Sequence, residues 1–204
     1  MTVEADQGRV ESRLGSGRVE CPDCPAALRP WGWARERRVR GLPGWLRPRR
    51  ARCPACLVTH VLLPVTVLSR RGYAVEVIGA ALVARAGGAG HRRIGLKLGV
   101  PAETVRGWLR VAAARLERTR LYLLQVAIRA GVDQPVPTAL GCPWRDLLAA
   151  LGAATAAVTG RFGAVGVVGS VTAWQVAAGC SGGRLLAPGW PPAGPAAGCN
   201  TSCP

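Results

Sequence analysis

Hydrophobic and polar positions change their period along this chain of 204 residues, and the changes mark its segments. Residues 35–40 and 45–52 alternate on either side of Gly41-Leu42-Pro43-Gly44, a pattern that predicts a short β-hairpin. An apolar, β-branched run over 58–68 follows, interrupted by Pro64. For that run we expect an extended link to the next unit.

From Tyr73 the period becomes helical. One apolar face of a first helix is marked by Val75, Ile78, Leu82 and Val83, and four consecutive small residues at 87–90 end it. A second, short helix is expected over about 92–98, stopped by Gly99. A third starts near Ala102 and, because neither Gly nor Pro intervenes, is expected to continue to about Arg129. The prediction for 70–130 is thus three helices with a long third one.

The remaining segments have simpler compositions. Residues 1–19 are expected to be a flexible leader, and 138–187, rich in Ala, Gly, Val and Leu, an apolar helical segment. The tail, 188–204, is rich in Pro, Gly and Ala and is expected to be disordered. The fold class predicted is mainly α, with a small β-containing segment at 20–60.

Part of the apolar segment, 147–178, is long enough to span a membrane. Its Ala and Gly residues give a weak drive for insertion, and Arg161 interrupts it. We therefore expect a helical unit that packs on the preceding helices or mediates a homodimer, and membrane attachment is the weaker alternative. The first 20 residues carry four acids and no apolar core, so they are not a secretory signal, and a cytoplasmic location is expected.

The charge of the chain is unevenly distributed. The formal net charge is +16, and residues 1–130 hold 24 of the 27 Lys and Arg against 9 of the 11 Asp and Glu, a net of +15. A concentrated basic field attracts polyanions, because each neutralised phosphate releases condensed counterions. Double-stranded DNA is therefore the expected partner, which implies a nucleoid-associated protein.

Two Cys-Pro-x-Cys motifs bracket the predicted hairpin. Cys21 and Cys24 form the first pair and Cys53 and Cys56 the second, with 28 residues between the pairs. Two such pairs can give four thiolates to a tetrahedral zinc ion at the ends of a ribbon. Four thiolates leave no open coordination position, so the predicted Zn²⁺ is structural. His60 could replace one cysteine as a ligand, although a surface or partly packed histidine is the preferred interpretation.

Residues 91–110, HRRIGLKLGVPAETVRGWLR, fit the layout of a helix-turn-helix. Gly95 is small where the two helices must cross, and Gly99 can adopt the left-handed conformation that reverses the chain. Apolar residues fall at the positions that must be buried: Ile94, Leu98, Val100, Val105, Trp108 and Leu109. Pro101 stands where a Ser or Thr cap is common, which weakens the cap but keeps the helix start.

The motifs carry a resemblance that covers about residues 20–187. The strings CPAC-LVTHVLLP, Arg70-Arg71-Gly72-Tyr73 and HRRIGLKLGVPAETVRGWLR resemble uncharacterised actinobacterial proteins with a zinc-ribbon-like head and a helix-turn-helix, which tend to lie near mobile elements. The same order of parts is similar to the DNA-binding head of some insertion-sequence transposases. The resemblance implies a helper or regulator associated with transposition, with the four cysteines as ligands and nothing catalytic.

Catalysis is not expected from this composition. A two-metal transposase needs several carboxylates, and only Glu117, Asp133 and Asp146 follow the predicted helix-turn-helix. A tyrosine nucleophile has only Tyr73 and Tyr122 to choose from. We therefore expect that this protein is not an enzyme.

These observations converge on a DNA-binding protein linked to transposition or transcription. Bases would be read by Thr104, Arg106 and Arg110, and phosphates clamped by Arg92 and Arg93. The ribbon would hold the backbone through Arg35, Arg37, Arg38, Arg40, Arg47, Arg49, Arg50 and Arg52. The alternative is a protein-interaction adaptor whose zinc ribbon docks a transposase, an integrase or another DNA-processing partner.

Overall fold

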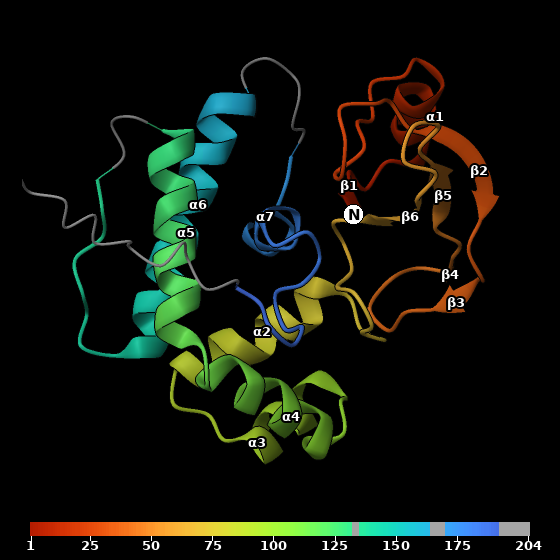
Figure 1. Ribbon diagram of the computed structural model, residues 1–204. Helices are drawn as coiled ribbons and strands as arrows, with labels where there is room; N and C mark the ends of the chain where they lie inside the picture. Colours follow the sequence, from red (N-terminus) through yellow and green to blue (C-terminus); the bar gives the residue numbers. More distant parts are fainter. Residues whose placement is uncertain (132–134, 164–169, 192–204) are drawn as a thin grey trace, which may run out of the picture.

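The computed structural model describes residues 1–131, 135–163 and 170–191. Figure 1 shows an N-terminal lobe that holds the β-structure beside a larger helical lobe. The strands are β1 (Thr2–Val3), β2 (Arg29–Trp33), β3 (Arg37–Arg38), β4 (Trp45–Leu46), β5 (Arg49–Arg52) and β6 (Thr59–Pro64). The helices within the described residues are α1 (Gln7–Gly15), α2 (Val75–Ala86), α3 (His91–Leu98), α4 (Ala102–Ala113), α5 (Leu116–Ala130), α6 (Pro143–Gly163) and α7 (Ala173–Cys180).

The N-terminal lobe contains a four-stranded sheet in the order β1-β6-β5-β2 and a separate pair, β3-β4. Strand β1 runs parallel to β6, and the other pairs are antiparallel. The predicted hairpin is present, with Arg37 opposite Leu46 around the predicted turn. It is longer than expected, because β2 and β5 continue the pairing beyond β3 and β4.

Two sequence predictions in this lobe are wrong. Residues 58–68 are not an extended link, because β6 lies inside the sheet between β1 and β5. Residues 1–19 are not a flexible leader, since they form β1 and α1. Asp6 caps α1 by accepting a hydrogen bond from the backbone N–H of Arg9 (3.1 Å), and Val10 and Leu14 are buried beneath the helix. Burial of one helical face is what orders this segment.

In the helical lobe, α2, α3 and α4 form where the apolar period predicted them. Of the four residues predicted to form the apolar face of the first helix, Val75, Ile78 and Leu82 are buried, whereas Val83 is 48% exposed. Gly99 ends α3 in the left-handed conformation, with φ of 62°. A Cβ on Gly95 would lie 2.7 Å from the carbonyl oxygen of Val100, so only glycine allows α3 and the turn to approach this closely.

The predicted long third helix is wrong as one element, because it breaks at 114–115 into α4 and α5. The Arg115 guanidinium donates hydrogen bonds to the carbonyl oxygens of Ala187 and Trp190, the latter at 3.0 Å. The break leaves α4 packed on α3 while α5 packs along α6. Tertiary contacts therefore override a helical pattern that no Gly or Pro interrupts.

Helices α5 and α6 run side by side in the same direction (Figure 1). Arg161 near the end of α6 donates a hydrogen bond to the carbonyl oxygen of Arg129 near the end of α5 (2.9 Å). Small buried side chains on α6, including Ala150, Ala154 and Ala157, allow this close approach. The apolar C-terminal segment thus packs on the helices that precede it. No helix among the described residues combines the length and apolarity needed to cross a membrane.

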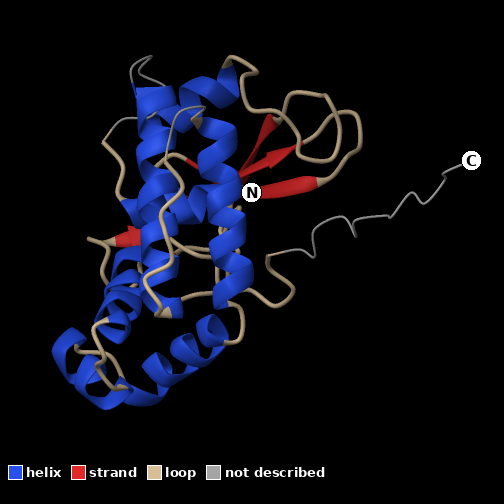
Figure 2. Ribbon diagram, turned by 90° about the vertical axis from the view of Figure 1, so that its left-hand side faces the viewer, coloured by secondary structure: helices blue, strands red, loops and turns tan. Residues whose placement is uncertain are grey.

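The beginning of the predicted disordered tail is packed rather than free. Trp190 is 3% exposed and its ring meets Tyr122 edge-on, with centroids 5.2 Å apart. Arg118 fixes the next residue by donating a hydrogen bond to the carbonyl oxygen of Pro191 (2.7 Å). The rest of the predicted tail, 192–204, lies outside the described residues. In Figure 2, turned by 90°, the long helices of this lobe stand in front and the strands lie behind and beside them.

Candidate metal centre and nucleic-acid interface

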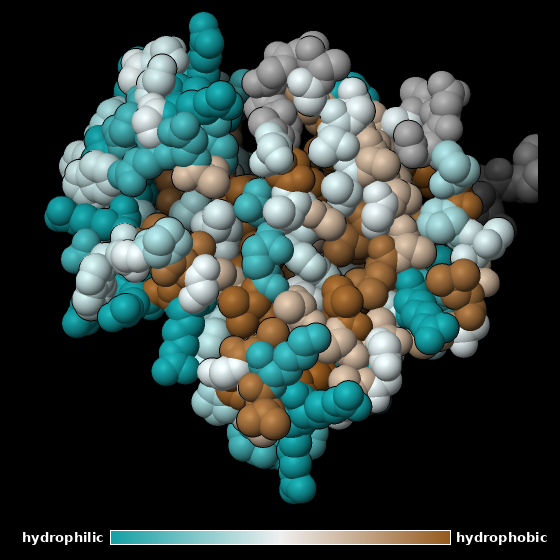
Figure 3. All heavy atoms as spheres, turned by 180° about the vertical axis from the view of Figure 1, so that it is seen from behind, coloured by the Kyte–Doolittle hydropathy of each residue, from teal (hydrophilic) through white to brown (hydrophobic). Residues whose placement is uncertain are grey.

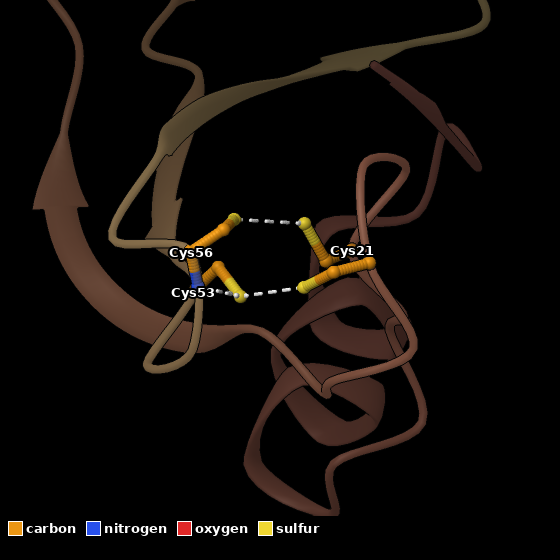
Figure 4. A group of neighbouring side chains, drawn as sticks. Cys21, Cys53 and Cys56 are labelled. Carbon is orange, nitrogen blue, oxygen red and sulfur yellow. Dashed lines mark hydrogen bonds between the residues drawn. The ribbon is translucent and has the colours of Figure 1, made fainter.

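The four predicted ligands come from two tight turns of the N-terminal lobe. Cys21 and Cys24 lie in the loop between α1 and β2, where the N–H of Cys21 donates to the carbonyl oxygen of Ala26 (2.8 Å). Cys53 and Cys56 lie in the turn between β5 and β6, where the N–H of Cys53 donates to the carbonyl oxygen of Val58 (2.9 Å). Each short hydrogen-bonded loop turns both of its thiols toward the other pair (Figure 4).

The thiols meet at distances that suit a metal ion. Cys21 Sγ lies 3.7 Å from Cys56 Sγ, and Cys24 Sγ lies 3.3 Å from Cys53 Sγ. All four sulfur atoms lie within 4.8 Å of one another. A tetrahedral ion with metal–sulfur bonds of about 2.3 Å separates its sulfur ligands by about 3.8 Å. The four cysteines can therefore hold one metal ion with small adjustments of their side chains.

The site rests on a small apolar core of its own. Cys53 is 0% and Cys21 7% exposed, and both belong to a buried cluster with Val10, Leu14 and Leu62. Cys56 is exposed, so the site has one side open to solvent. Helix α1, which the sequence analysis took for part of a flexible leader, thus packs beneath the cysteine cluster. The signals for it were Asp6 as a cap and apolar residues at 10 and 14.

The thiols of the cluster differ in pKa, because each has different hydrogen-bond partners. The backbone N–H of Cys56 points at Cys53 Sγ (3.5 Å) and, with the thiol of Cys24, lowers the pKa of the Cys53 thiol to about 6. The backbone around Val58 lowers the pKa of the Cys56 thiol, but partial desolvation of its sulfur and the three neighbouring thiols outweigh this effect and raise the pKa to about 12. Crowded thiols resist losing all their protons together, and a bound cation would remove that resistance.

His60 offers an alternative ligand from β6. Its Nε2 lies 3.5 Å from Cys21 Sγ and 3.8 Å from a carboxylate oxygen of Asp23. The side chain is 10% exposed, which agrees with the partly packed histidine expected from the sequence. Cys21, Asp23 and His60 form a second group of candidate metal ligands that shares Cys21 with the first. One ion can use one of these groups, and the four cysteines supply the fuller set.

The residues predicted to read bases all belong to α4, but they do not share one side of it: Arg106 and Arg110 are neighbours on the helix surface, whereas Thr104 lies on the opposite flank of the buried stripe. Arg106 and Arg110 are exposed and Thr104 is partly buried. The buried stripe of α4 places Val105, Trp108 and Leu109 in the main core. Arg106 forms an ion pair with Glu103 (2.6 Å), in which both side chains are well exposed. Such a pair is weak, so Arg106 is free to exchange it for another anion at little cost.

Arg92 and Arg93 are exposed near the start of α3, and Lys97 follows in its last turn. Helices α3 and α4 are adjacent at one end of the molecule (Figure 1). The five predicted helix contacts are therefore on neighbouring elements.

The eight arginines predicted to bind the DNA backbone from the N-terminal lobe differ in exposure. Arg35, Arg38, Arg40 and Arg47 are exposed, whereas Arg37, Arg49, Arg50 and Arg52 are partly buried. Arg49 forms an ion pair with Glu11 of α1 (2.9 Å) and donates a hydrogen bond to the carbonyl oxygen of Gly32 (2.7 Å). Its side chain is 14% exposed. Arg49 therefore ties α1 to the sheet, and its guanidinium is engaged within the protein.

Exposed tryptophans accompany these arginines, a feature that the charge pattern alone missed. The Arg52 guanidinium lies 4.6 Å from the ring centroid of Trp31, and the Arg49 guanidinium lies 4.7 Å from that of Trp33. Trp31 is 52% and Trp33 38% exposed. Seen from behind, hydrophilic side chains gather over the N-terminal lobe (Figure 3). The available signal was the Trp-Gly-Trp of β2 together with the arginine-rich sequence of β5.

The residues considered for catalysis make contacts within the protein. Glu117 pairs with Arg120 on α5 (2.7 Å), and Asp146 accepts a hydrogen bond from the N–H of Leu140 (2.5 Å). Tyr122 donates its hydroxyl to the carbonyl oxygen of Cys180 (2.5 Å), and Tyr73 packs on Trp108. Asp133 lies outside the described residues.

Comparisons with known proteins give this chain no family and no neighbour. No family model matches it, and the searches of curated proteins and of solved structures likewise returned no match. The candidate sites therefore stand on their own geometry.

Proposed function

We propose that this chain is a sequence-specific, double-stranded DNA-binding protein in which α3 and α4 act as a helix-turn-helix. Helix α4 enters the major groove and presents Thr104, Arg106 and Arg110 to base edges. Arg92 and Arg93 of α3 bind phosphates beside it. The observation that carries the proposal is the two-sided α4, which buries Val105, Trp108 and Leu109 and exposes arginines opposite them.

The turn supports this assignment. A helix-turn-helix requires close approach of its two helices, and the 2.7 Å that would separate a Gly95 Cβ from the Val100 carbonyl leaves no room for a side chain. Gly99 supplies the left-handed turn residue. Net positive charge on the chain then raises the local concentration of DNA and speeds encounter.

The four cysteines hold a structural Zn²⁺ in the proposed protein. Sulfur-only ligation by two Cys-x-x-Cys pairs is typical of structural zinc, and the thiolates leave no open position for a substrate. The role of the ion is to fix the two turns against α1 and thereby to shape the basic lobe. Following the resemblance of its motifs, the biological role we assign is an accessory or regulatory factor of transposition or transcription.

Selection from a random duplex pool tests the function. Zinc-loaded protein is mixed with the pool across a salt series, and the retained DNA is sequenced. We expect an enriched motif and an affinity that falls steeply with salt. Retention without enrichment would contradict sequence-specific recognition. No retention, together with indifference to heparin, would overturn DNA binding and favour a protein-interaction adaptor.

Single variants then assign the contacts. Arg106→Ala should weaken the selected site about 5- to 150-fold and relax the choice of base at one position. Arg38→Ala, on the exposed hairpin, should weaken all sequences alike and reduce the salt slope by about one. Arg145→Ala removes the same charge from α6 and should leave both measurements unchanged. Equal effects of the first two variants would contradict the division between base and phosphate contacts.

A further inference from the structure

The N-terminal sheet has a face on the side away from α1, which we call the outer sheet face. Side chains alternate along a strand, and directly opposite residues of an antiparallel pair share a face. Ala51 and Leu62 are buried on the inner face. Arg50 opposite Val61, and Arg52 opposite Thr59, therefore belong to the outer sheet face.

Trp31 lies on this face as an exposed flat ring. It falls at the irregularity of β2, where the pairing skips from Pro30 to Gly32. The guanidinium of Arg52 lies 4.6 Å from its ring centroid. Since Arg52 belongs to the outer sheet face, its contact brings the indole there as well. Burying a ring that is 52% exposed requires a partner with a flat apolar surface.

A groove extends the same face. It is lined by Val61 and Leu63 of β6 and edged by Arg35, Arg37 and Arg70, with the acidic Glu36 between the first two arginines, so that the edge has a net positive charge. Leu63 follows Val61 by two residues and so shares its face. Arg70 reaches the groove from the turn that follows β6. Arginines thus accompany an aromatic ring and a shallow apolar strip.

We propose that the outer sheet face binds single-stranded DNA, with a base stacked on Trp31 and phosphates bound by Arg50, Arg52 and the groove arginines. A groove that follows the phosphates and an aromatic ring for stacking are the two elements of sequence-tolerant single-strand binding. A duplex hides the faces of its bases, so it cannot use the ring in this way. The inference deepens the proposed DNA-binding function, because it assigns unpaired DNA to the sheet and duplex DNA to α4.

Fluorescence anisotropy distinguishes the two sites. The full, zinc-loaded chain is titrated into a labelled oligo(dT) of about 12 nucleotides and, separately, into a labelled duplex. Trp31→Ala should weaken oligo(dT) binding about 10-fold and leave duplex binding within about twofold. Trp31→Phe should keep most of the affinity, because a phenyl ring still stacks. Arg106→Ala should show the reverse preference and weaken the duplex alone.

The control is Trp45→Ala, which removes a tryptophan that is 63% exposed on the separate β3-β4 pair. It should leave oligo(dT) binding unchanged. An equal loss in Trp31→Ala and Trp45→Ala, or duplex binding without oligo(dT) binding, would overturn the inference. Oligo(dT) binding that depends on Trp31, with no duplex binding, would support the inference and contradict the proposed function of α4.

Discussion

The ring of Tyr73 meets the indole of Trp108 edge-on, with centroids 5.0 Å apart and an angle of 79° between the planes. Tyr73 lies two residues before the start of α2 and forms a backbone bridge with Arg40, which follows β3. Trp108 belongs to the buried side of α4. The pair therefore connects the β-hairpin of the N-terminal lobe with the helix proposed to read DNA.

Removing the Tyr73 ring should loosen this connection. Tyr73→Ala should lower the free energy of unfolding by about 2 kcal/mol, because a partly buried aromatic contact is lost. Tyr73→Phe keeps the ring and loses only the long hydroxyl contact with Arg40 (3.4 Å), so it should cost about 0.5 kcal/mol. Urea unfolding measures both. Equal losses would show that the hydroxyl matters more than the ring.

Gly95 of α3 and Gly107 of α4 allow the same Gly→Ala substitution to be compared in a crowded and in an open helical position. Gly95→Ala places a methyl group 2.7 Å from the Val100 carbonyl oxygen and should destabilise the protein by about 1–3 kcal/mol. Around Gly107, in the middle of α4, nothing lies within 4 Å of the added Cβ. Gly107→Ala should therefore stabilise the protein by about 0.5–1 kcal/mol. Thermal unfolding of the two variants gives the signs, and a neutral Gly95→Ala would contradict the crowded turn.

Loss of the metal should unfold the N-terminal lobe before the helices. We expect one zinc ion per chain by elemental analysis, and a chelator should abolish amide protection in β5 and β6 while α5 and α6 stay protected. Cys53→Ser should reproduce the effect, whereas Cys142→Ser, outside the cluster, should keep the zinc. If Cys53→Ser bound a full equivalent of zinc, the four-cysteine site would be wrong.

Alkaline pH should act through Tyr122. Burial, and next the neighbouring Cys180, raise the pKa of Tyr122 above its ordinary 10.0. The folded state then holds the phenolic proton more tightly than the unfolded state does. Its contribution to stability is complete below pH 10 and is lost as the pH rises through the higher pKa of the folded state.

Tyr122→Phe should therefore flatten the loss of stability above pH 10. It should also cost about 1 kcal/mol at neutral pH, because the hydrogen bond to the Cys180 carbonyl oxygen disappears. Chemical denaturation at several pH values measures both effects. If the free energy of unfolding of the variant still fell as steeply above pH 10, a group other than Tyr122 would be responsible for the loss of stability.

Sequence reasoning succeeded where the signal is local. The Cys-Pro-x-Cys pairs predicted the cysteine cluster, because each short turn orients its two thiols whatever the rest of the chain does. Gly99 predicted the turn between α3 and α4, since the left-handed conformation is costly for other residues. The apolar period likewise marked the buried side of α4.

Sequence reasoning failed where distant contacts decide. The end of α4 depends on Arg115, whose carbonyl partners at Ala187 and Trp190 come from a segment expected to be disordered in part. Nothing near Arg115 in the sequence signals a helix break. Likewise, the charge pattern treated Arg49 as a free cation, whereas Glu11 and Gly32 engage it. A pairing between α1 and the sheet cannot be read from either segment alone.

Strand β2 closes the sheet at its outer edge, next to β5. An edge strand offers free backbone groups with which a second chain can pair. Here Pro30 has no N–H to donate, and the skipped register at Trp31 breaks the regular spacing of the remaining groups. An incoming strand therefore meets an interrupted row of hydrogen-bonding groups. We therefore expect the irregularity that presents Trp31 to disfavour intermolecular β-pairing at this edge as well.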